Sequence, residues 1–241
     1  MRSPPPRRDF FTLPRVEHPR TIRSFVTRAG RITEAQQRAL EESWPKYGVE
    51  FDGSTVLDLD TLFGRRAPRV VEIGFGNGEN LAALATAHPE RDYLGIEVHR
   101  AGVGRLMLAA ETAQLTNVRI ACHDAVEVLT HQLPPQSLDE LLILFPDPWH
   151  KKRHHKRRLI QAPFVELAVS RLAAGGIFRL ATDWEPYAIQ MLEVLGANGT
   201  LENLSPERGY VEKPIERITT RFEKRGQRLG HGVWDLAFRR R

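Results

Sequence analysis

The chain has 241 residues, of which 41% are hydrophobic and 27% charged, the ordinary composition of a folded domain. No apolar run is long enough to cross a bilayer, and the N-terminus lacks the hydrophobic core of a secretion signal. The single cysteine, Cys122, excludes an internal disulfide and a cysteine zinc cluster. We therefore expect a cytoplasmic protein with one sizeable domain, and neither a membrane protein nor a secreted one.

Positive charge is concentrated in three segments, although the net charge is only +5. Residues 1–33 contain eight arginines and two acids, residues 151–158 contain six Lys/Arg and no acid, and residues 221–241 contain seven Lys/Arg and two acids. One such run is often only a solvated surface. Three of them on one chain favour a polyanionic partner, because neutralised phosphates release counterions and so drive association.

Residues 1–20 are rich in Pro and Arg without periodicity and are predicted to be a flexible basic tail. A helix is predicted after Thr33, which can cap it while Gln36 reaches back, and Trp44-Pro45 should end this helix. We expect a single domain over 21–241, with a helical extension at 21–66 before a core at 67–241.

From Ala67 onward, short apolar runs alternate with helical segments. The predicted strands are RVVEIG, DYLGIEV, NVRIAC, LDELLILF and GIFRLAT, and the fourth is followed by a helical segment over 157–173. A last apolar run, GVWDLAF, is a further strand. The pattern predicts an α/β fold: a Rossmann-like, doubly wound, mostly parallel sheet of seven strands with helices on both faces and the last strand antiparallel at or near the edge. Such sheets bind ligands at the carboxyl ends of their strands.

The first strand ends in a glycine loop, Glu72-Ile73-Gly74-Phe75-Gly76-Asn77-Gly78. Dinucleotide sites use G-x-G-x-x-G, whereas the spacing here is G-x-G-x-G with an acid two residues before the first glycine. That acid would repel a pyrophosphate and attract a cation, so a ligand with an ammonium or sulfonium group fits better than NAD.

The next two strands also end in acids. Glu97 is placed to accept hydrogen bonds from both hydroxyls of a ribose, which is typical of nucleoside sites of several kinds. Asp124 is placed to bind an adenine amino group or to cap the following helix, and both roles are compatible. Together with the glycine loop, these acids favour adenosine binding.

The fourth strand ends in Pro146-Asp147-Pro148-Trp149, where the two prolines hold the Asp147 carboxylate in a rigid loop. Trp149 could stack on a base or simply pack. The six cations of 151–158 would grip phosphates next to that base. His150, His154 and His155 lie nearby, but the surrounding positive charge opposes a divalent cation, so no metal site is predicted.

The chain resembles the bacterial tRNA (guanine-N7-)-methyltransferases, which are class I S-adenosylmethionine-dependent enzymes. The resemblance covers nearly everything from Ile22 onward. It rests on several motifs in order: IRSFVTRAGRITEAQQRAL, VVEIGFGNGENL, YLGIEVHRAGVGRL, PDPWHKKRHHKRR, ATDWEPYA and TTRFEKRGQRLGHGVWDL.

The resemblance implies methylation of N7 of a guanosine at position 46, in the tRNA variable loop, with S-adenosylmethionine as methyl donor. It implies that Asp147 is the catalytic residue. The implied cofactor contacts are Glu72, Gly74, Gly76, Gly78, Glu97, Asp124 and Asp147. The implied substrate contacts are Lys151, Asp183, Thr220, Arg221, Phe222 and Glu223. The implied RNA contacts are Arg153, His154, His155, Lys156, Arg157 and Arg158.

The segment Arg217–Glu223 departs from the family pattern R-P-x-T-K-F-E, with Ile218 in place of Pro and Arg221 in place of Lys. The side chain of Arg ends in a planar fork and that of Lys in a compact charge, so the geometry of the implied substrate contact at Arg221 differs from that in the family. Two other functions are compatible with parts of the sequence: a non-catalytic RNA-binding protein on the same scaffold, and an NAD-dependent oxidoreductase. The four acids argue against the first, and the glycine spacing argues against the second. The sequence leaves the oligomeric state open between monomer and homodimer.

Overall fold

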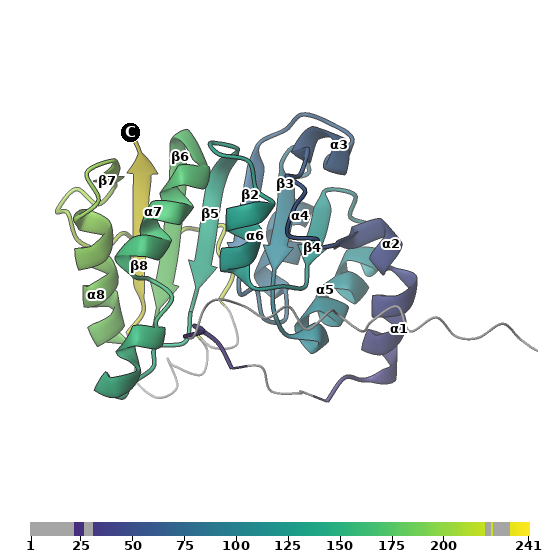
Figure 1. The fold of residues 1–241 in the computed structure, drawn as a ribbon, viewed down its shortest axis with the longest axis horizontal. Coiled ribbons are helices and arrows are strands. Elements are labelled where there is room, and N and C mark those ends of the chain that lie inside the picture. Colours follow the sequence, from purple (N-terminus) through teal and green to yellow (C-terminus); the bar gives the residue numbers. More distant parts are fainter. Residues whose placement is uncertain (1–21, 27–30, 220–222, 224–231) are drawn as a thin grey trace, which may run out of the picture.

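The computed structural model describes residues 22–26, 31–219, 223 and 232–241, so the predicted tail at 1–20 lies outside the described residues. Its centre is one eight-stranded sheet in the order β1-β4-β3-β2-β5-β6-β8-β7 (Figure 1). The strands are β1 (Gly48–Val49), β2 (Arg69–Ile73), β3 (Asp92–Ile96), β4 (Val118–Ala121), β5 (Leu138–Leu144), β6 (Leu172–Thr182), β7 (Leu201–Asn203) and β8 (Trp234–Arg240). The α-helices are α1 (Glu34–Glu42), α2 (Trp44–Tyr47), α3 (Leu59–Phe63), α4 (Glu79–Ala87), α5 (Arg100–Thr112), α6 (Ala125–His131), α7 (Ala162–Arg171) and α8 (Glu185–Gly196).

The predicted sheet class is confirmed, but the sheet has eight strands instead of seven. Six strands from β1 to β6 run parallel, and β8 is antiparallel to both of its neighbours, β6 and β7. Two of the eight, β1 and β7, are only two and three residues long. Such short strands leave no apolar run in the sequence, because their pairing depends on the neighbouring strand and not on their own pattern.

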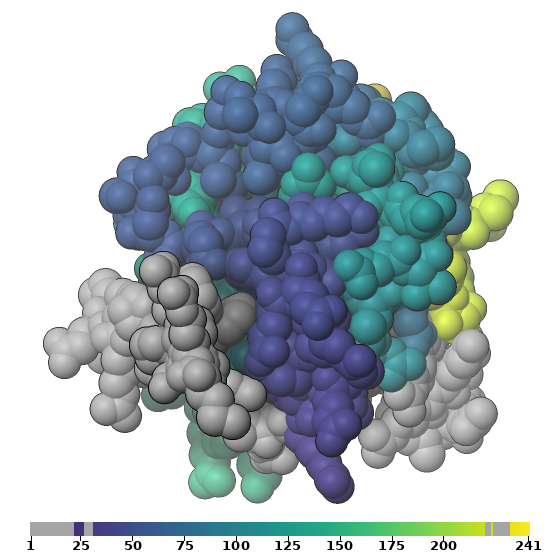
Figure 2. All heavy atoms as spheres, turned by 90° about the vertical axis from the view of Figure 1, so that its right-hand side faces the viewer, coloured from purple at the N-terminus to yellow at the C-terminus, as the bar shows by residue number. Residues whose placement is uncertain are grey.

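Helices cover both faces of the sheet with two separate apolar layers. One layer contains side chains of α3, α6, α7 and α8, and the other contains side chains of α1, α2, α4 and α5. Figure 2 shows α1 and α2, in purple, forming the surface in the middle of one side of the molecule. The predicted N-terminal helical segment therefore packs on the sheet domain, where α1 lies against α5.

The predicted capping box of α1 is present. The Thr33 hydroxyl accepts from the backbone N–H of Gln36 (3.2 Å), and the Gln36 side chain accepts from the N–H of Thr33 (2.9 Å). The helix ends at Glu42, and Pro45 lies in the first turn of the short α2. The helical segment predicted over 157–173 is shorter than expected, because α7 begins only at Ala162, with Pro163 in its first turn. The cation-rich residues before it form a 3₁₀ helix, η1 (Lys152–Arg157).

The parallel register brings the carboxyl ends of the central strands to one edge of the sheet. Ile73 of β2 pairs with Ile96 of β3 and with Ile143 of β5, and Ile96 pairs with Ala121 of β4. The loops that follow these strands therefore start side by side. Within the described part of the chain, no helix combines the length and apolar character needed to cross a membrane.

Candidate functional site

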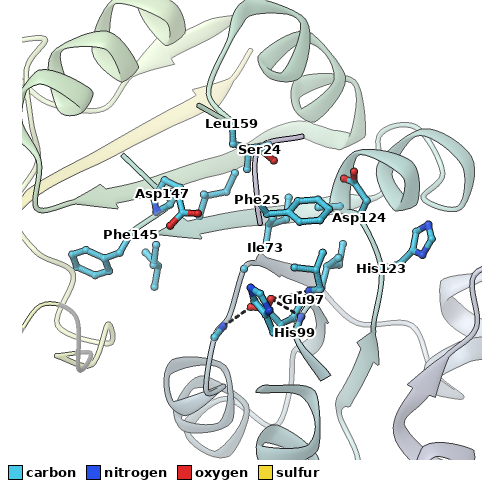
Figure 3. A pocket seen from close by; sticks show the side chains of 18 residues that line it. Ser24, Phe25, Ile73, Glu97, His99, His123, Asp124, Phe145, Asp147 and Leu159 are labelled. Carbon is cyan, nitrogen blue, oxygen red and sulfur yellow. Dashed lines mark hydrogen bonds between the residues drawn. The ribbon is translucent and has the colours of Figure 1, made fainter. Parts of the chain in front are cut away.

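A cavity of about 250 Å³ lies at this edge of the sheet (Figure 3). Its walls come from the ends of β2, β3, β4 and β5 and from the N-terminal segment 22–26. The lining residues are Ser24, Phe25, Ile73, Gly74, Gly76, Ile96, Glu97, Val98, His99, His123, Asp124, Ala125, Ile143, Leu144, Phe145, Pro146, Asp147 and Leu159. Three of the four acids predicted to bind the cofactor are among them: Glu97, Asp124 and Asp147.

The glycine loop forms one wall of the cavity. Gly74, Gly76 and Gly78 have φ of +70°, +59° and +76°, a left-handed conformation that side-chain-bearing residues rarely adopt. A Cβ at Gly74 or Gly76 would meet nothing within 4 Å, so the space above these two residues is open. A ligand therefore has room to approach this backbone closely.

Glu97, which follows β3, is fixed by three backbone N–H donors. Its Oε2 accepts from Gly76 (2.9 Å), and its Oε1 accepts from Val98 (2.7 Å) and His99 (3.0 Å). The side chain is buried, and Figure 3 shows it beside His99 at the base of the cavity. These bonds tie the carboxylate to the glycine loop and give it one orientation.

Glu72, near the end of β2, comes just before the glycine loop and is not among the residues that line the cavity. It is 3% exposed, and its Oε2 accepts from Nδ2 of Asn80 (3.1 Å). Burial, with a contribution from the negative charge of Glu97, raises the pKa of Glu72 to about 7, although the Asn80 hydrogen bond acts in the opposite direction. Glu72 is thus the only one of the four acids that does not line the cavity.

Asp124 lines the cavity and also caps α6, since its carboxylate accepts from the N–H of Val126 (2.9 Å). The oxygen that accepts the hydrogen bond from Val126 is Oδ1. The structure therefore shows the capping role that the sequence predicted as one of two compatible roles. His123, which the sequence reading did not assign, also lines the cavity, and its ring stacks on Phe51 with centroids 3.8 Å apart.

Asp147 is exposed at the edge of the cavity, on a loop with an unusual backbone. Phe145 and Trp149, on either side of Pro146-Asp147-Pro148, both have left-handed φ, +54° and +46°. Partial burial of the carboxyl raises the pKa of Asp147, while the charges of His99 and Arg157 act in the opposite direction. The strained loop presents this carboxylate at a fixed place.

The N-terminal segment 22–26 reaches the site, which the sequence reading did not predict. The backbone carbonyl of Ser24 accepts from the indole N–H of Trp149 (3.1 Å), and those of Arg23 and Phe25 accept from Arg157 (3.2 Å each). The guanidinium of Arg157 also lies 3.9 Å from the Trp149 ring centroid. Trp149 therefore has a packing role, one of its two predicted roles. Figure 3 shows Phe25 between Asp124 and Asp147.

The predicted RNA-contact block divides into exposed and buried members. Lys151, Lys152, Arg153 and Lys156 are exposed, and His154, His155 and Arg157 are half-buried. Arg158 is only 3% exposed, so the expectation that it contacts RNA does not fit its placement. Burial occurs because its guanidinium is directed inward, to the carbonyl of Pro148 and the side chain of Gln190.

The predicted substrate residues are partly within the described chain. Lys151 is exposed, and the half-buried Asp183 follows β6 at the same sheet edge. Thr220, Arg221 and Phe222 lie outside the described residues.

Glu223 is 2% exposed and is paired with Arg217 (2.7 Å) and Lys213 (3.0 Å). Burial favours its neutral form, but the hydrogen bonds from both cations outweigh this and lower the pKa of Glu223. Its carboxylate is therefore engaged by protein groups, which does not fit the expectation that it binds the substrate nucleotide directly. Within the described residues, no cluster of three or more His, Cys, Asp or Glu side chains is arranged to hold a metal ion.

The comparisons with known proteins place this chain among the methyltransferases. A family model described as "Putative methyltransferase" matches residues 66–236. The fold is similar to those of solved methyltransferases. The 16S rRNA methyltransferase KamB superposes with a TM-score of 0.55 at 16% identity, over 77% of this chain and 94% of that one. A 16S rRNA (adenine(1408)-N(1))-methyltransferase from Catenulisporales acidiphilia, solved with cosubstrate SAM, gives 0.53 at 17% identity, over 80% and 92%.

Closer relatives define the family. A tRNA (guanine-N(7)-)-methyltransferase of Yersinia pestis (strain Pestoides F) is 57% identical over 223 residues, 92% of each chain. One of Escherichia coli O6:K15:H31 (strain 536 / UPEC) is 56% identical over 221 residues, again 92% of each. The chain belongs to the tRNA (guanine-N(7)-)-methyltransferase family, which confirms the resemblance read from the sequence.

Proposed function

We propose that this protein transfers a methyl group from S-adenosylmethionine to N7 of a guanosine in tRNA, at position 46 in the variable loop. The observation that carries the proposal is the cavity at the carboxyl edge of the sheet, where Glu97, Asp124 and Asp147 lie around one hollow. The identity of 56–57% with tRNA (guanine-N(7)-)-methyltransferases supports the choice of substrate and of base atom.

The residues present fit the methyl donor. Glu97 is held by three N–H groups at the end of β3, where it would accept from the ribose hydroxyls. The open space above Gly74 and Gly76 would admit the amino-acid portion of the ligand next to the backbone. Asp124 lines the same cavity and would accept from the adenine amino group. Gly78 completes the turn of the loop, and the buried Glu72, hydrogen-bonded to Asn80, would support the wall on which the ligand lies.

The chemistry asks for positioning more than for proton transfer. When bound, S-adenosylmethionine supplies a methyl group on a sulfonium and departs as S-adenosylhomocysteine. Guanine N7 carries an in-plane lone pair, so no residue of the chain must remove a proton before transfer. The tasks left to the chain are to align the base with the donor and to stabilise the positive charge that reaches the purine. Asp147, held by its strained loop at the cavity edge, is proposed to do both.

The tRNA side of the site is proposed to lie along the exposed block that follows Asp147. Lys152, Arg153 and Lys156 would contact phosphates, and the half-buried His154, His155 and Arg157 lie among them. Lys151 and Asp183 are proposed to contact the substrate nucleotide, together with Thr220, Arg221 and Phe222. Glu223, paired with Arg217, is proposed to hold that last segment in place. Transfer to tRNA implies that the protein acts in the cytoplasm.

The decisive experiment uses the purified protein, labelled S-adenosylmethionine and bulk tRNA, followed by nucleoside analysis of the digested product. Label in 7-methylguanosine from the variable loop is the expected result, and label in another nucleoside would contradict the proposal. Asp147→Asn and Asp147→Ala should each lower the rate of transfer, on the order of 100-fold, since a preorganised electrostatic contact is lost. Near-normal turnover in both would remove Asp147 from its proposed role.

A further inference from the structure

One buried arginine, Arg158, connects the loop that carries Asp147 to helix α8. Its Nε donates to the carbonyl of Pro148 (2.8 Å), and its Nη1 donates to Oε1 of Gln190 (2.6 Å). Its guanidinium carbon lies 4.7 Å from the ring centroid of Tyr187. One end of this side chain therefore contacts the residue next to Asp147, and the rest lies against α8.

The α8 end of this connection is well anchored. Tyr187 is fully buried, and its hydroxyl accepts from the N–H of Ile160 (3.1 Å). Gln190 donates from Nε2 to the carbonyl of the same residue, Ile160 (3.0 Å). Helix α8 begins two residues after Asp183, the second acid proposed to contact the substrate nucleotide. Arg158 therefore connects the loop that carries Asp147 to the helix that follows Asp183.

The loop requires such support. Phe145 and Trp149 both have left-handed φ, and each residue of this kind costs about 1 to 3 kcal/mol. Such a backbone persists only where its surroundings hold it. The Arg158 hydrogen bond to Pro148 acts between these two strained residues, where release of the carbonyl would let the loop relax.

Charge pairing does not explain an arginine at this position. Within the described parts of the chain no carboxylate forms an ion pair with it, and its Nη2 is buried without a hydrogen-bond partner there. A buried cation without a counter-charge costs stability, so an apolar residue would serve packing better. What arginine offers instead is a rigid fork that binds two acceptors on different elements at once.

We propose that Arg158 is a positioning residue for methyl transfer, which fixes Pro148, and through it the Asp147 carboxylate, relative to α8. The inference rests on the proposed function, because it assigns a role within that same site. Arg158 does not touch the substrate. Its effect on the rate passes through Asp147.

A double-mutant cycle tests this dependence, with single-turnover transfer from labelled S-adenosylmethionine to saturating tRNA as the readout. Arg158→Met should slow transfer by roughly 10- to 100-fold, because a misplacement of about 1 Å can cost that much. In an Asp147→Ala background the same change should cost less than about threefold, because the group that it positions is gone. Dissociation constants for both ligands should change by less than about twofold.

A matched control distinguishes a specific effect on the position of Asp147 from the effect of losing any arginine that donates to a backbone carbonyl. Arg171 on α7 donates to the carbonyl of Leu129 (2.7 Å), away from the cavity. Arg171→Met should leave the rate within about twofold of wild type. The inference is overturned if Arg158→Met slows transfer equally in both backgrounds, or no more than Arg171→Met does.

A second variant tests the inference in case Arg158→Met folds poorly. Gln190→Leu keeps Arg158 and removes its acceptor on α8, and it should slow transfer about 3- to 10-fold in the wild-type background only. An equal loss in the Asp147→Ala background would overturn the inference. Suppose that the wild-type protein methylates tRNA and that Asp147→Ala slows transfer. If Arg158→Met and Gln190→Leu then transfer the methyl group at the wild-type rate, only the inference fails. If wild type does not modify guanosine N7, the proposed function itself fails.

Discussion

Glu72 is a buried acid whose charge state should be visible in the stability of the whole protein. Burial, with a contribution from the charge of Glu97, raises its pKa from 4.5 to about 7. Between these pH values the folded state binds a proton at Glu72 that the unfolded state does not. The free energy of unfolding should therefore fall as pH rises from about 4.5 to 7, and this loss should be complete above pH 7.

The expected size of this effect is about 3 kcal/mol, from 1.36 kcal/mol for each unit of pKa difference. Urea unfolding of wild type and Glu72→Gln at pH 5, 6, 7 and 8 measures it, since Gln cannot ionise. The difference between the two proteins should change across this range, in favour of Gln at high pH. A difference that is constant with pH would show that Glu72 does not titrate with a raised pKa.

Gly102 of α5 is where a single methyl group should disturb the glycine loop. A Cβ on Gly102 would lie 2.1 Å from the carbonyl oxygen of Gly76, a contact that forces the backbone to move. We expect Gly102→Ala to weaken binding of S-adenosylmethionine by 10-fold or more, because overpacking of this kind costs about 1 to 3 kcal/mol. Titration calorimetry measures the dissociation constant.

Gly196 provides the control for Gly102. It is the last residue of α8, and a Cβ there would meet nothing within 4 Å. Gly196→Ala should leave the dissociation constant unchanged within about twofold. Equal affinities in the two alanine variants would mean that the glycine loop adapts to the added methyl group.

At the scale of elements, Arg217 and Glu223 are attached to β8 by a buried charge cluster. Arg217 donates to Asp235 of β8 (2.9 and 3.0 Å) and to Glu223 (2.7 Å), and all three are at most 7% exposed. Its guanidinium carbon also lies 5.5 Å from the ring centroid of Phe145, at the end of β5. The cluster thus fixes the chain that leads to the predicted substrate-binding residues.

Arg217→Leu should destabilise the protein by about 3 to 5 kcal/mol, because two buried acids lose their shared cation. Adding Asp235→Asn should recover part of that loss, since one uncompensated charge is removed. The exposed pair Arg239–Glu202, 3.6 Å apart with both side chains 48% exposed, is the comparison. Arg239→Ala should cost less than about 1 kcal/mol. Urea unfolding gives all three values, and similar losses for Arg217→Leu and Arg239→Ala would contradict the structural role of the cluster.

The parallel core was predictable because it is encoded locally. Continuous apolar runs followed by Gly74, Glu97, Asp124 and Asp147 identify both the strands and the edge at which their ends meet. The short β1 and β7 were not predictable, because each is defined by its partner. The inward direction of Arg158 was hidden for the same reason: its acceptors, Pro148 and Gln190, are set by tertiary packing and not by the run of cations that contains it.

At the scale of the molecule, exposed cations follow the loop that carries Asp147, so RNA affinity should depend strongly on salt. Lys152, Arg153 and Lys156 are exposed and follow Asp147 within ten residues. Each phosphate contact releases a counterion, so the logarithm of the association constant should fall linearly with the logarithm of salt concentration. Removing one contacting cation should reduce the slope by roughly one, whatever the tRNA sequence.

The prediction is tested with Lys152→Ala and Arg153→Ala, measuring tRNA binding by fluorescence anisotropy between 50 and 300 mM KCl, roughly the range over which such contacts lose most of their effect. Arg66 is the control: it is also exposed, but it precedes β2 and so lies at the opposite edge of the sheet from the cavity. Arg66→Ala should keep the wild-type slope. If all three variants share one slope, tRNA does not lie along the block that follows Asp147. If Arg66→Ala alone lowers it, the polyanion binds at the other edge, away from the carboxylates that are proposed to act on it.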